Sequence, residues 1–163
     1  MIRRNHIRCT GPGAFLWGLV IMGAITCSGD AAGPNNNAEP FFPLGFKQTY
    51  SLVRDCRFSI EHDGHNILVY ANPEAAAAYL MGTYPFQQGT VIVKELYRNP
   101  NCSDLFGYAA MRKGAPGTAP QSGDWEWQNV GVDGKVQSGV QPSSCISCHS
   151  NCSNGRDLTC TDP

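Results

Sequence analysis

The chain has no excess of charge of either sign. Its formal net charge at pH 7 is -1, so its charge gives no reason to expect a nucleic-acid partner. It also lacks an apolar run of the roughly 20 residues that a transmembrane helix needs, and it contains no internal repeat or long low-complexity stretch. The chain has 163 residues, about the length of one domain, and its 42% hydrophobic content is enough to fill a core.

The N-terminal part is predicted to be an export segment and flexible tether at residues 1–38, followed by one folded domain at residues 39–163. Residues 14–26 are almost free of polar side chains, and the start of the chain carries three positive charges, on Arg3, Arg4 and Arg8. A charged start before a short apolar run is typical of a secretory signal. We therefore expect the protein to be exported.

The end of this apolar run leaves two processing routes open. Cys27 follows the run directly, as in a bacterial lipoprotein signal, and would then carry a lipid that attaches the protein to a membrane. Thr26 and Ala24 depart from the residues preferred at those positions, which favours ordinary cleavage near Ala31 or Ala32. The two routes predict an envelope-anchored and a periplasmic protein, respectively.

A C-x-x-C-H motif lies near the C-terminus, at Cys145, Cys148 and His149. This is the attachment signature of a c-type haem, in which two thiols add to the two vinyl groups and the histidine ligates the iron. A redox dithiol, a disulfide or half of a zinc site would be alternatives, the last with Cys152 and Cys160 as further ligands. The adjacent histidine and the export signal favour one covalently attached haem c.

Four of the 8 cysteines remain once the export segment and the haem motif are set aside: Cys56, Cys102, Cys152 and Cys160. An even remainder in an exported domain predicts two disulfides, for which three pairings exist. The turn dipeptide Asn154-Gly155 separates the last two cysteines. We therefore predict the pairs Cys152–Cys160 and Cys56–Cys102.

The pattern of the middle of the chain predicts an α+β domain, mainly an antiparallel sheet with a few helices. Predicted strands cover residues 66–71, 89–98, 105–112 and 125–130, and a loop rich in Gly, Pro, Ala and Ser covers 113–124. Asn72 is placed to cap a helix that opens with Pro73 and runs to Met81. Asp133-Gly134 predicts a hairpin turn into residues 135–137.

No methionine follows His149. The chain therefore differs from small helical cytochromes, in which the haem motif opens the domain and a later methionine supplies the sixth ligand. Any second axial ligand or pocket must come from the preceding sheet. Met81 and Met111 are the candidates if the protein is a six-coordinate electron carrier, although core positions suit both.

Lys94 occupies an unusual place in the predicted strand at 89–98. On an alternating strand, Ile92, Lys94 and Leu96 share one face, so the lysine lies between two aliphatic neighbours. A lysine in such a place also occurs where its side chain reaches solvent and protects a sheet edge from aggregation. Both interpretations remain open from the residues alone.

Three sequence features together resemble the cytochrome P-460 family. They are the strand segment GTVIVKE at 89–95, YPF at 84–86, and GDWEW at 123–127 before the terminal haem motif. The resemblance covers about residues 69–149. It implies an exported mono-haem c-type cytochrome with a sheet-rich fold, His149 as the proximal ligand and a five-coordinate iron.

The resemblance also implies an activity. In the hydroxylamine-oxidising members, a lysine at the position of Lys94 is covalently joined to the haem, and electrons pass to another cytochrome. The related cytochromes c′-beta lack this bond and bind nitric oxide. We therefore expect an oxidoreductase acting on hydroxylamine or a related small nitrogen species, with nitric-oxide binding or plain electron transfer as alternatives. A homodimer is an open alternative to a monomer.

The pocket over the iron needs groups that handle protons. We consider His62, His65 and Arg57 as candidates, together with three weaker ones, Arg54, Asp124 and Glu126. Sequence spacing does not place any of them over the haem. Trp125 and Trp127 share a strand face and are expected to pack in the core.

Overall fold

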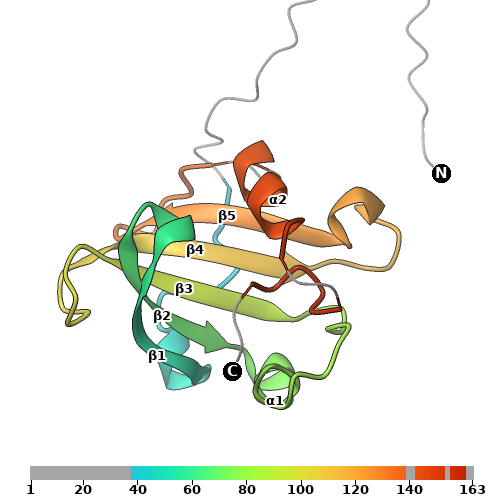
Figure 1. The fold of residues 1–163 in the computed structure, drawn as a ribbon, viewed down its shortest axis with the longest axis horizontal. Coiled ribbons are helices and arrows are strands. Elements are labelled where there is room, and N and C mark those ends of the chain that lie inside the picture. The colour runs from blue at the N-terminus through green and yellow to red at the C-terminus, as the bar shows by residue number, and fades with distance from the viewer. Residues whose placement is uncertain (1–37, 139–141, 153–154, 161–163) are drawn as a thin grey trace, which may run out of the picture.

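The computed structural model describes residues 38–138, 142–152 and 155–160. A five-stranded antiparallel sheet lies at its centre, with the strands in the order β1-β2-β3-β4-β5 (Figure 1). The strands are β1 Ser51–Ser59, β2 His65–Ala71, β3 Val91–Tyr97, β4 Leu105–Lys113 and β5 Trp125–Gly131. The α-helices in the described part are α1 Pro73–Met81 and α2 Ser143–His149, and the short 3-10 helices are Phe46–Gln48, Ile60–His62 and Pro120–Ser122. The predicted α+β class is confirmed.

Four of the strands and helix α1 follow the predicted boundaries closely. The Asp133-Gly134 turn is also present, and Val136 pairs with Val130 across it in an isolated bridge. Strand β1 was not predicted, because most of its residues are exposed and its pairing with β2 shifts register twice. A strand of this kind carries no regular alternation of apolar and polar residues for sequence analysis to detect.

The prediction that Asn72 caps helix α1 is wrong for its side chain. Asn72 does hold the N-cap position, but its side chain makes no capping hydrogen bond. Its amide nitrogen donates to the carbonyl of Gly89, at 2.9 Å, and its amide oxygen accepts from the backbone nitrogen of Val91, at 3.0 Å. Asn72 therefore joins the start of α1 to the start of β3.

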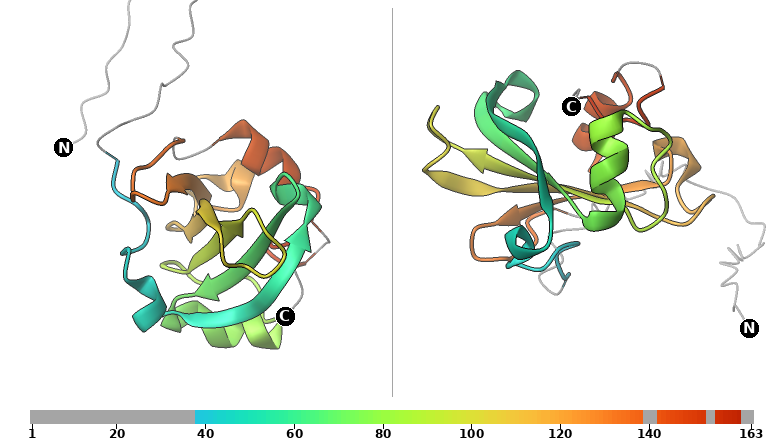
Figure 2. Two further views of the ribbon diagram at one scale, coloured as in Figure 1. Left: turned by 90° about the vertical axis from the view of Figure 1, so that its left-hand side faces the viewer. Right: turned by 90° about the horizontal axis from the view of Figure 1, so that it is seen from below.

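The two faces of the sheet carry different layers. Both α-helices pack on one face, and the segment from residue 38 to β1 covers the other (Figure 2). The helix-covered face contributes to a core that includes Val69, Ile92, Met111, Trp125 and Trp127. The opposite face packs Val91, Val93, Ala110 and Val130 against Phe42 and Phe46. The alternation predicted for β3 is therefore observed.

Both predicted disulfides are present. Cys56–Cys102 joins β1 to the connection between β3 and β4, and Cys152–Cys160 closes a short segment after α2. Cys145 and Cys148 are free thiols. The cysteine pairs predicted from an even remainder are thus confirmed.

The predicted export segment, with Cys27 and the apolar run at 14–26, lies outside the described residues apart from its last position. Among the residues that the structure describes, no helix has the length and apolar character to cross a bilayer.

Candidate functional site

A cavity of about 520 Å³ opens on the helix-covered side of the sheet. Its volume lies within the range of pockets that hold small molecules and cofactors, about 300 to 1,000 Å³. Most of the site residues predicted from the sequence line this one cavity: Lys94, His62, His65, Arg57, Arg54, Cys145, Cys148 and His149. Segments that are far apart in the chain therefore meet where the chemistry was expected.

Helix α2 presents the haem motif to the cavity. Cys145 and His149 are four residues apart and Cys148 is three from Cys145, spacings that place side chains on one side of a helix. Cys145 is partly buried and Cys148 is exposed. Burial raises the pKa of the Cys145 thiol, so this sulfur stays protonated at neutral pH.

His149 is oriented by a backbone group. Its Nδ1 atom lies 2.7 Å from the carbonyl oxygen of Leu158. A carbonyl only accepts hydrogen bonds, so Nδ1 carries the proton and Nε2 keeps a free lone pair. Burial, with a contribution from the positive charge of Lys94, lowers the pKa of His149 to about 4. The imidazole is therefore neutral at pH 7, in the tautomer that metal-ligating histidines adopt.

Lys94 lies on the cavity side of β3, as predicted from the strand pattern. Its side chain is buried and its neighbours Ile92 and Leu96 line the same wall. Burial lowers the pKa of Lys94 to about 8 from an ordinary value of 10.5, because an ammonium ion is poorly solvated there. The lysine thus neither reaches solvent nor lies at a sheet edge, and its neutral amine is accessible.

His62 is the direct partner of Lys94. The Nε2 atom of His62 lies 3.0 Å from the lysine Nζ. Burial, followed by the charges of Lys94, His149 and His65, lowers the pKa of His62 to about 3. A neutral imidazole accepts a hydrogen bond from an ammonium, so at pH 7 Nζ donates and Nε2 accepts. The pair is a proton donor and acceptor in contact.

The remaining candidates differ in their surroundings. His65 stacks on Phe106, with ring centroids 4.9 Å apart, and Arg57 also lines the cavity. Asp124 instead accepts hydrogen bonds from backbone nitrogens in its own loop, and Glu126 pairs with Arg112. Neither of these two carboxylates lines the cavity, so they are set aside as pocket groups.

The two methionines considered as sixth ligands also differ in their surroundings. Met81 is 78% exposed, whereas Met111 is buried and lines the cavity. Met111 pairs with Trp127 across β4 and β5. The expectation that Met111 packs in the core is confirmed, and Met81 is wrong as a core residue because its side chain points to solvent.

Two buried donors on cavity-lining residues have no hydrogen-bond partner among the residues that the structure describes. They are Nη1 of Arg54 and Nε1 of Trp127. A buried donor without an acceptor costs about 1 to 3 kcal/mol. The carboxylates of a haem would supply acceptors to such donors, and together with two thiols and an imidazole Nε2 the donor set fits this cofactor. The expectation for Trp127 as a core residue holds, but its unpaired nitrogen was missed.

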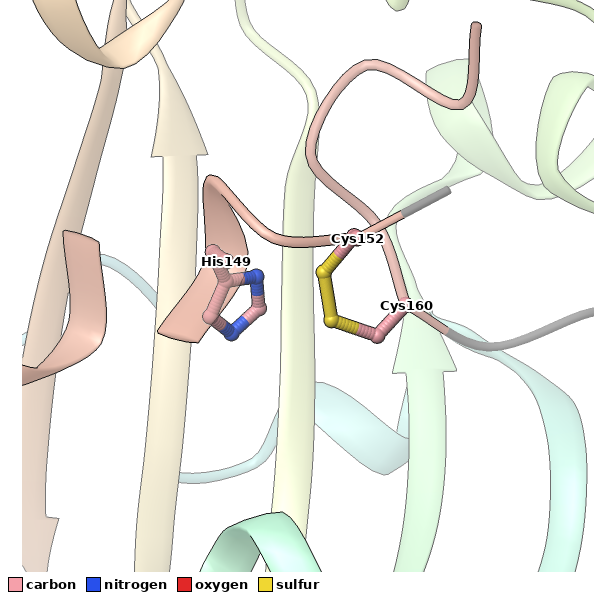
Figure 3. A group of neighbouring side chains, drawn as sticks. All are labelled: His149, Cys152 and Cys160. Atoms are coloured by element: carbon pink, nitrogen blue, oxygen red, sulfur yellow. A yellow bond between two sulfur atoms is a disulfide. The ribbon is translucent and has the colours of Figure 1, made fainter. Parts of the chain in front are cut away.

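His149 also lies beside the Cys152–Cys160 disulfide (Figure 3). A ring nitrogen and the two sulfurs lie within 4.8 Å of one another. The sulfur species that binds a metal is the thiolate, and these sulfurs are joined to each other. The zinc alternative therefore loses its two further ligands, and His149 is the member of this trio with a nitrogen lone pair available to a metal.

The comparison with protein families matches residues 43–161 to Cytochrome P460. The chain belongs to the cytochrome P460 family. The match covers nearly all of the folded part, including every cavity residue discussed above. It supports a c-type cytochrome with haem c as its cofactor and iron as its metal. The comparison with curated proteins finds no match.

Proposed function

We propose that this chain is an exported mono-haem cytochrome that oxidises hydroxylamine or a related small nitrogen species. One observation carries the proposal: the buried amine of Lys94 shares a cavity with the haem motif and lies 3.0 Å from a neutral imidazole. An amine in this place is suited to the lysine–haem bond of the hydroxylamine-oxidising members.

The residues that would hold the cofactor have separate tasks. Cys145 and Cys148 would form the two thioethers, and His149 would ligate the iron through Nε2. Arg54 and Trp127 would donate to the haem carboxylates. Haem c, when bound, supplies an iron that binds the nitrogen species and accepts its electrons.

Lys94 would form a covalent bond from its Nζ to the edge of the macrocycle. The bond replaces one N–H of the amine and one C–H of the ring, so two electrons and two protons leave. An oxidant such as peroxide must take these electrons. A neutral amine is the nucleophile, and the lowered pKa of Lys94 makes this form accessible. His62 is placed to receive the proton.

The same pocket would serve the substrate. Oxidation of hydroxylamine releases protons as well as electrons, and a base in the cavity assists that loss. His62 is neutral at pH 7 and offers an Nε2 lone pair to a released proton, although its lowered pKa of about 3 makes it a weak base. His65 and Arg57 line the cavity with it and would orient a small polar ligand.

Nitric-oxide binding without catalysis is the second candidate function. Phe58 and Phe106 line the cavity, and an aromatic wall suits a small apolar gas better than a polar substrate. In this case Lys94 would stay unlinked. A six-coordinate electron carrier would instead need Met111 as its sixth ligand, and that side chain is packed against Trp127 and the core.

The setting of the reaction belongs to the same proposal. The protein would act in the periplasm, or on the envelope if Cys27 is lipidated, and a second cytochrome would accept its electrons. Two disulfides in the described residues suit an oxidising compartment. A homodimer is the assembly to be tested against a monomer.

Mass spectrometry of haem peptides from the matured protein tests the proposal. We expect the haem to carry both the 145–149 segment and the strand peptide with Lys94, to survive acid-acetone extraction, and to show a red-shifted five-coordinate ferrous spectrum. If the Lys94 peptide is free and the spectrum is unmodified, nitric-oxide binding replaces the enzyme. A six-coordinate low-spin spectrum would instead indicate electron transfer.

A further inference from the structure

A short disulfide-closed segment follows helix α2 and touches its last residue. Cys152 and Cys160 form the disulfide, and Leu158 lies between them in the sequence. The Leu158 carbonyl is the acceptor for Nδ1 of His149, at 2.7 Å. The group that orients the imidazole thus belongs to a loop that a disulfide closes.

Asp157 fixes this loop to the sheet. Its carboxylate oxygens lie 2.6 and 2.8 Å from Nζ of Lys113 at the end of β4, and its Oδ2 accepts from the backbone nitrogen of Phe86, at 2.8 Å. Its carbonyl accepts from Nε1 of Trp125 in β5, at 2.8 Å. The Asp157 and Lys113 side chains are each 10% exposed. A mostly buried ion pair and two further hydrogen bonds therefore hold one residue in place.

Two successive residues of the loop have an unfavourable backbone conformation. Asp157 and Leu158 have φ angles of 49° and 62°, a left-handed region that costs energy in residues other than glycine. Two such residues in succession persist only where their surroundings fix them. The disulfide and the Asp157 contacts are the constraints that the structure shows around them.

We propose that the segment of residues 155–160, which the Cys152–Cys160 disulfide ties to the chain just after α2 and Asp157 anchors to the sheet, is a positioning element that sets the electron donation of His149 to the haem iron. The inference rests on the proposed role of His149 as the axial ligand. A hydrogen bond donated from Nδ1 raises the basicity of an imidazole ligand. A more basic ligand stabilises ferric over ferrous iron and lowers the reduction potential. The loop acts through the Leu158 carbonyl, whose place depends on the disulfide and on Asp157.

Two matured double variants test the role of the disulfide. Cys152→Ser with Cys160→Ser opens the loop, and Cys56→Ser with Cys102→Ser opens the other disulfide as a matched control. We expect the first variant to show a lower iron–histidine stretching frequency in the ferrous resonance Raman spectrum and a higher midpoint potential. The control should match the wild type in both readouts, because its disulfide joins β1 to the connection between β3 and β4 and does not constrain the Leu158 carbonyl.

Reduction of the matured wild-type protein avoids any failure of maturation. A water-soluble phosphine converts the disulfide and one water to two thiols and a phosphine oxide, and the thiols are then blocked by alkylation. The treated control variant, in which only the Cys152–Cys160 disulfide remains to be reduced, should show the same two shifts. Unchanged spectra and potentials in both the opened variant and the treated protein would overturn the inference.

A second pair of variants tests the anchor. Asp157→Asn weakens the contact with Lys113 but keeps the disulfide, so we expect smaller shifts in the same directions. Asp104→Asn is its control, since it weakens the exposed pair of Asp104 with Arg98. Equal spectra for the two variants would show that Asp157 has no positioning role. If the wild type itself has no iron–histidine band, the proposed axial ligand fails, and this inference fails with it.

Discussion

Lys94 is the residue on which the choice between catalysis and gas binding depends. Replacement by leucine puts a shorter, apolar side chain in a buried place, so the fold and the two thioethers should survive. We expect Lys94→Leu to lose the red-shifted spectrum and hydroxylamine oxidation while it still binds nitric oxide. Lys135→Leu is the control, because Lys135 lies on the surface in an exposed pair with Asp133. Steady-state hydroxylamine oxidation and optical spectra provide the comparison, and full activity in Lys94→Leu would refute the role.

His62 should control how readily the lysine reacts. With a pKa of about 8, only about a tenth of the Lys94 amines are neutral at pH 7, and this fraction rises with pH. Bond formation in haem-loaded, still unlinked protein should therefore accelerate from pH 7 to 9. His62→Ala removes the acceptor at Nε2 and should slow the reaction several-fold at pH 7.

The control for this experiment is His65→Ala, which removes a second imidazole from the same cavity but not the contact with Lys94. The linked fraction is counted by mass spectrometry at successive times after peroxide is added. Equal rates in the two histidine variants would show that His62 takes no part in the proton transfer.

At the scale of the elements, sequence analysis succeeded where one pattern determined one structure. The β3 segment is rich in β-branched residues and bounded by turn residues, so a strand was predictable, and with it the residues that share a face with Lys94. Pro73 and the alanines after it determined α1. Strand β1 failed because exposed residues and two register shifts hide its period. Helix α2 was recognised as a haem motif but not as a helix, because serine and cysteine are weak helix formers.

The link between α1 and β3 gives a stability prediction. Asn72 is buried and bonds the Gly89 carbonyl and the Val91 nitrogen. Asn72→Ala would leave both backbone groups without these partners and should lower the free energy of unfolding by about 2 kcal/mol. Asn101→Ala removes an exposed hydrogen bond to Ser103 instead and should cost less than about 0.5 kcal/mol. Urea denaturation measures the free energy of unfolding of both variants. An equal decrease in the two would contradict the role of Asn72 in joining α1 to β3.

The two disulfides should differ in their effect on stability. Cys56–Cys102 spans 46 positions and Cys152–Cys160 spans 8. In the chain-entropy treatment, the longer loop contributes up to about 4 kcal/mol and the shorter up to about 2.5 kcal/mol. Opening Cys56–Cys102 should therefore lower the melting temperature more, although it leaves the iron–histidine signal unchanged. Calorimetry of the two double-serine variants measures both melting temperatures. A larger decrease on opening Cys152–Cys160 would contradict this prediction.

At the scale of the whole molecule, the cavity combines groups that are not neighbours in the sequence. Arg54 comes from β1, Lys94 from β3, Trp127 from β5 and His149 from α2. The motif and the strand pattern identified His149 and Lys94, whereas Arg54 was only a weaker candidate for the pocket and Trp127 was expected in the core. The unpaired nitrogens of Arg54 and Trp127, and the anchoring role of Asp157, depend on packing between distant segments and left no local signal in the sequence.

The assembled cavity makes the stability of the haem-free chain depend on pH. A Cys145→Ser, Cys148→Ser chain carries no attached haem and keeps Lys94 buried. The lysine pKa is about 8 in the folded chain and close to its ordinary 10.5 when unfolded. Between pH 8 and pH 10.5 the unfolded chain binds more protons than the folded chain, so the free energy of unfolding must rise with pH. Below pH 8 the full penalty applies, at most about 3 kcal/mol.

We therefore expect this haem-free chain to gain stability between pH 7 and 9.5, as measured by urea denaturation. The same chain with Lys94→Leu has no ammonium to bury, so it should be more stable at pH 7 and change little over this range. The interval avoids the histidines, because His62 and His149 have lowered pKa values of about 3 and 4 and titrate in acid. If the free energy of unfolding changes with pH in the same way in both chains, burial does not destabilise the charged form of Lys94. Its amine would then be no more reactive than that of a surface lysine.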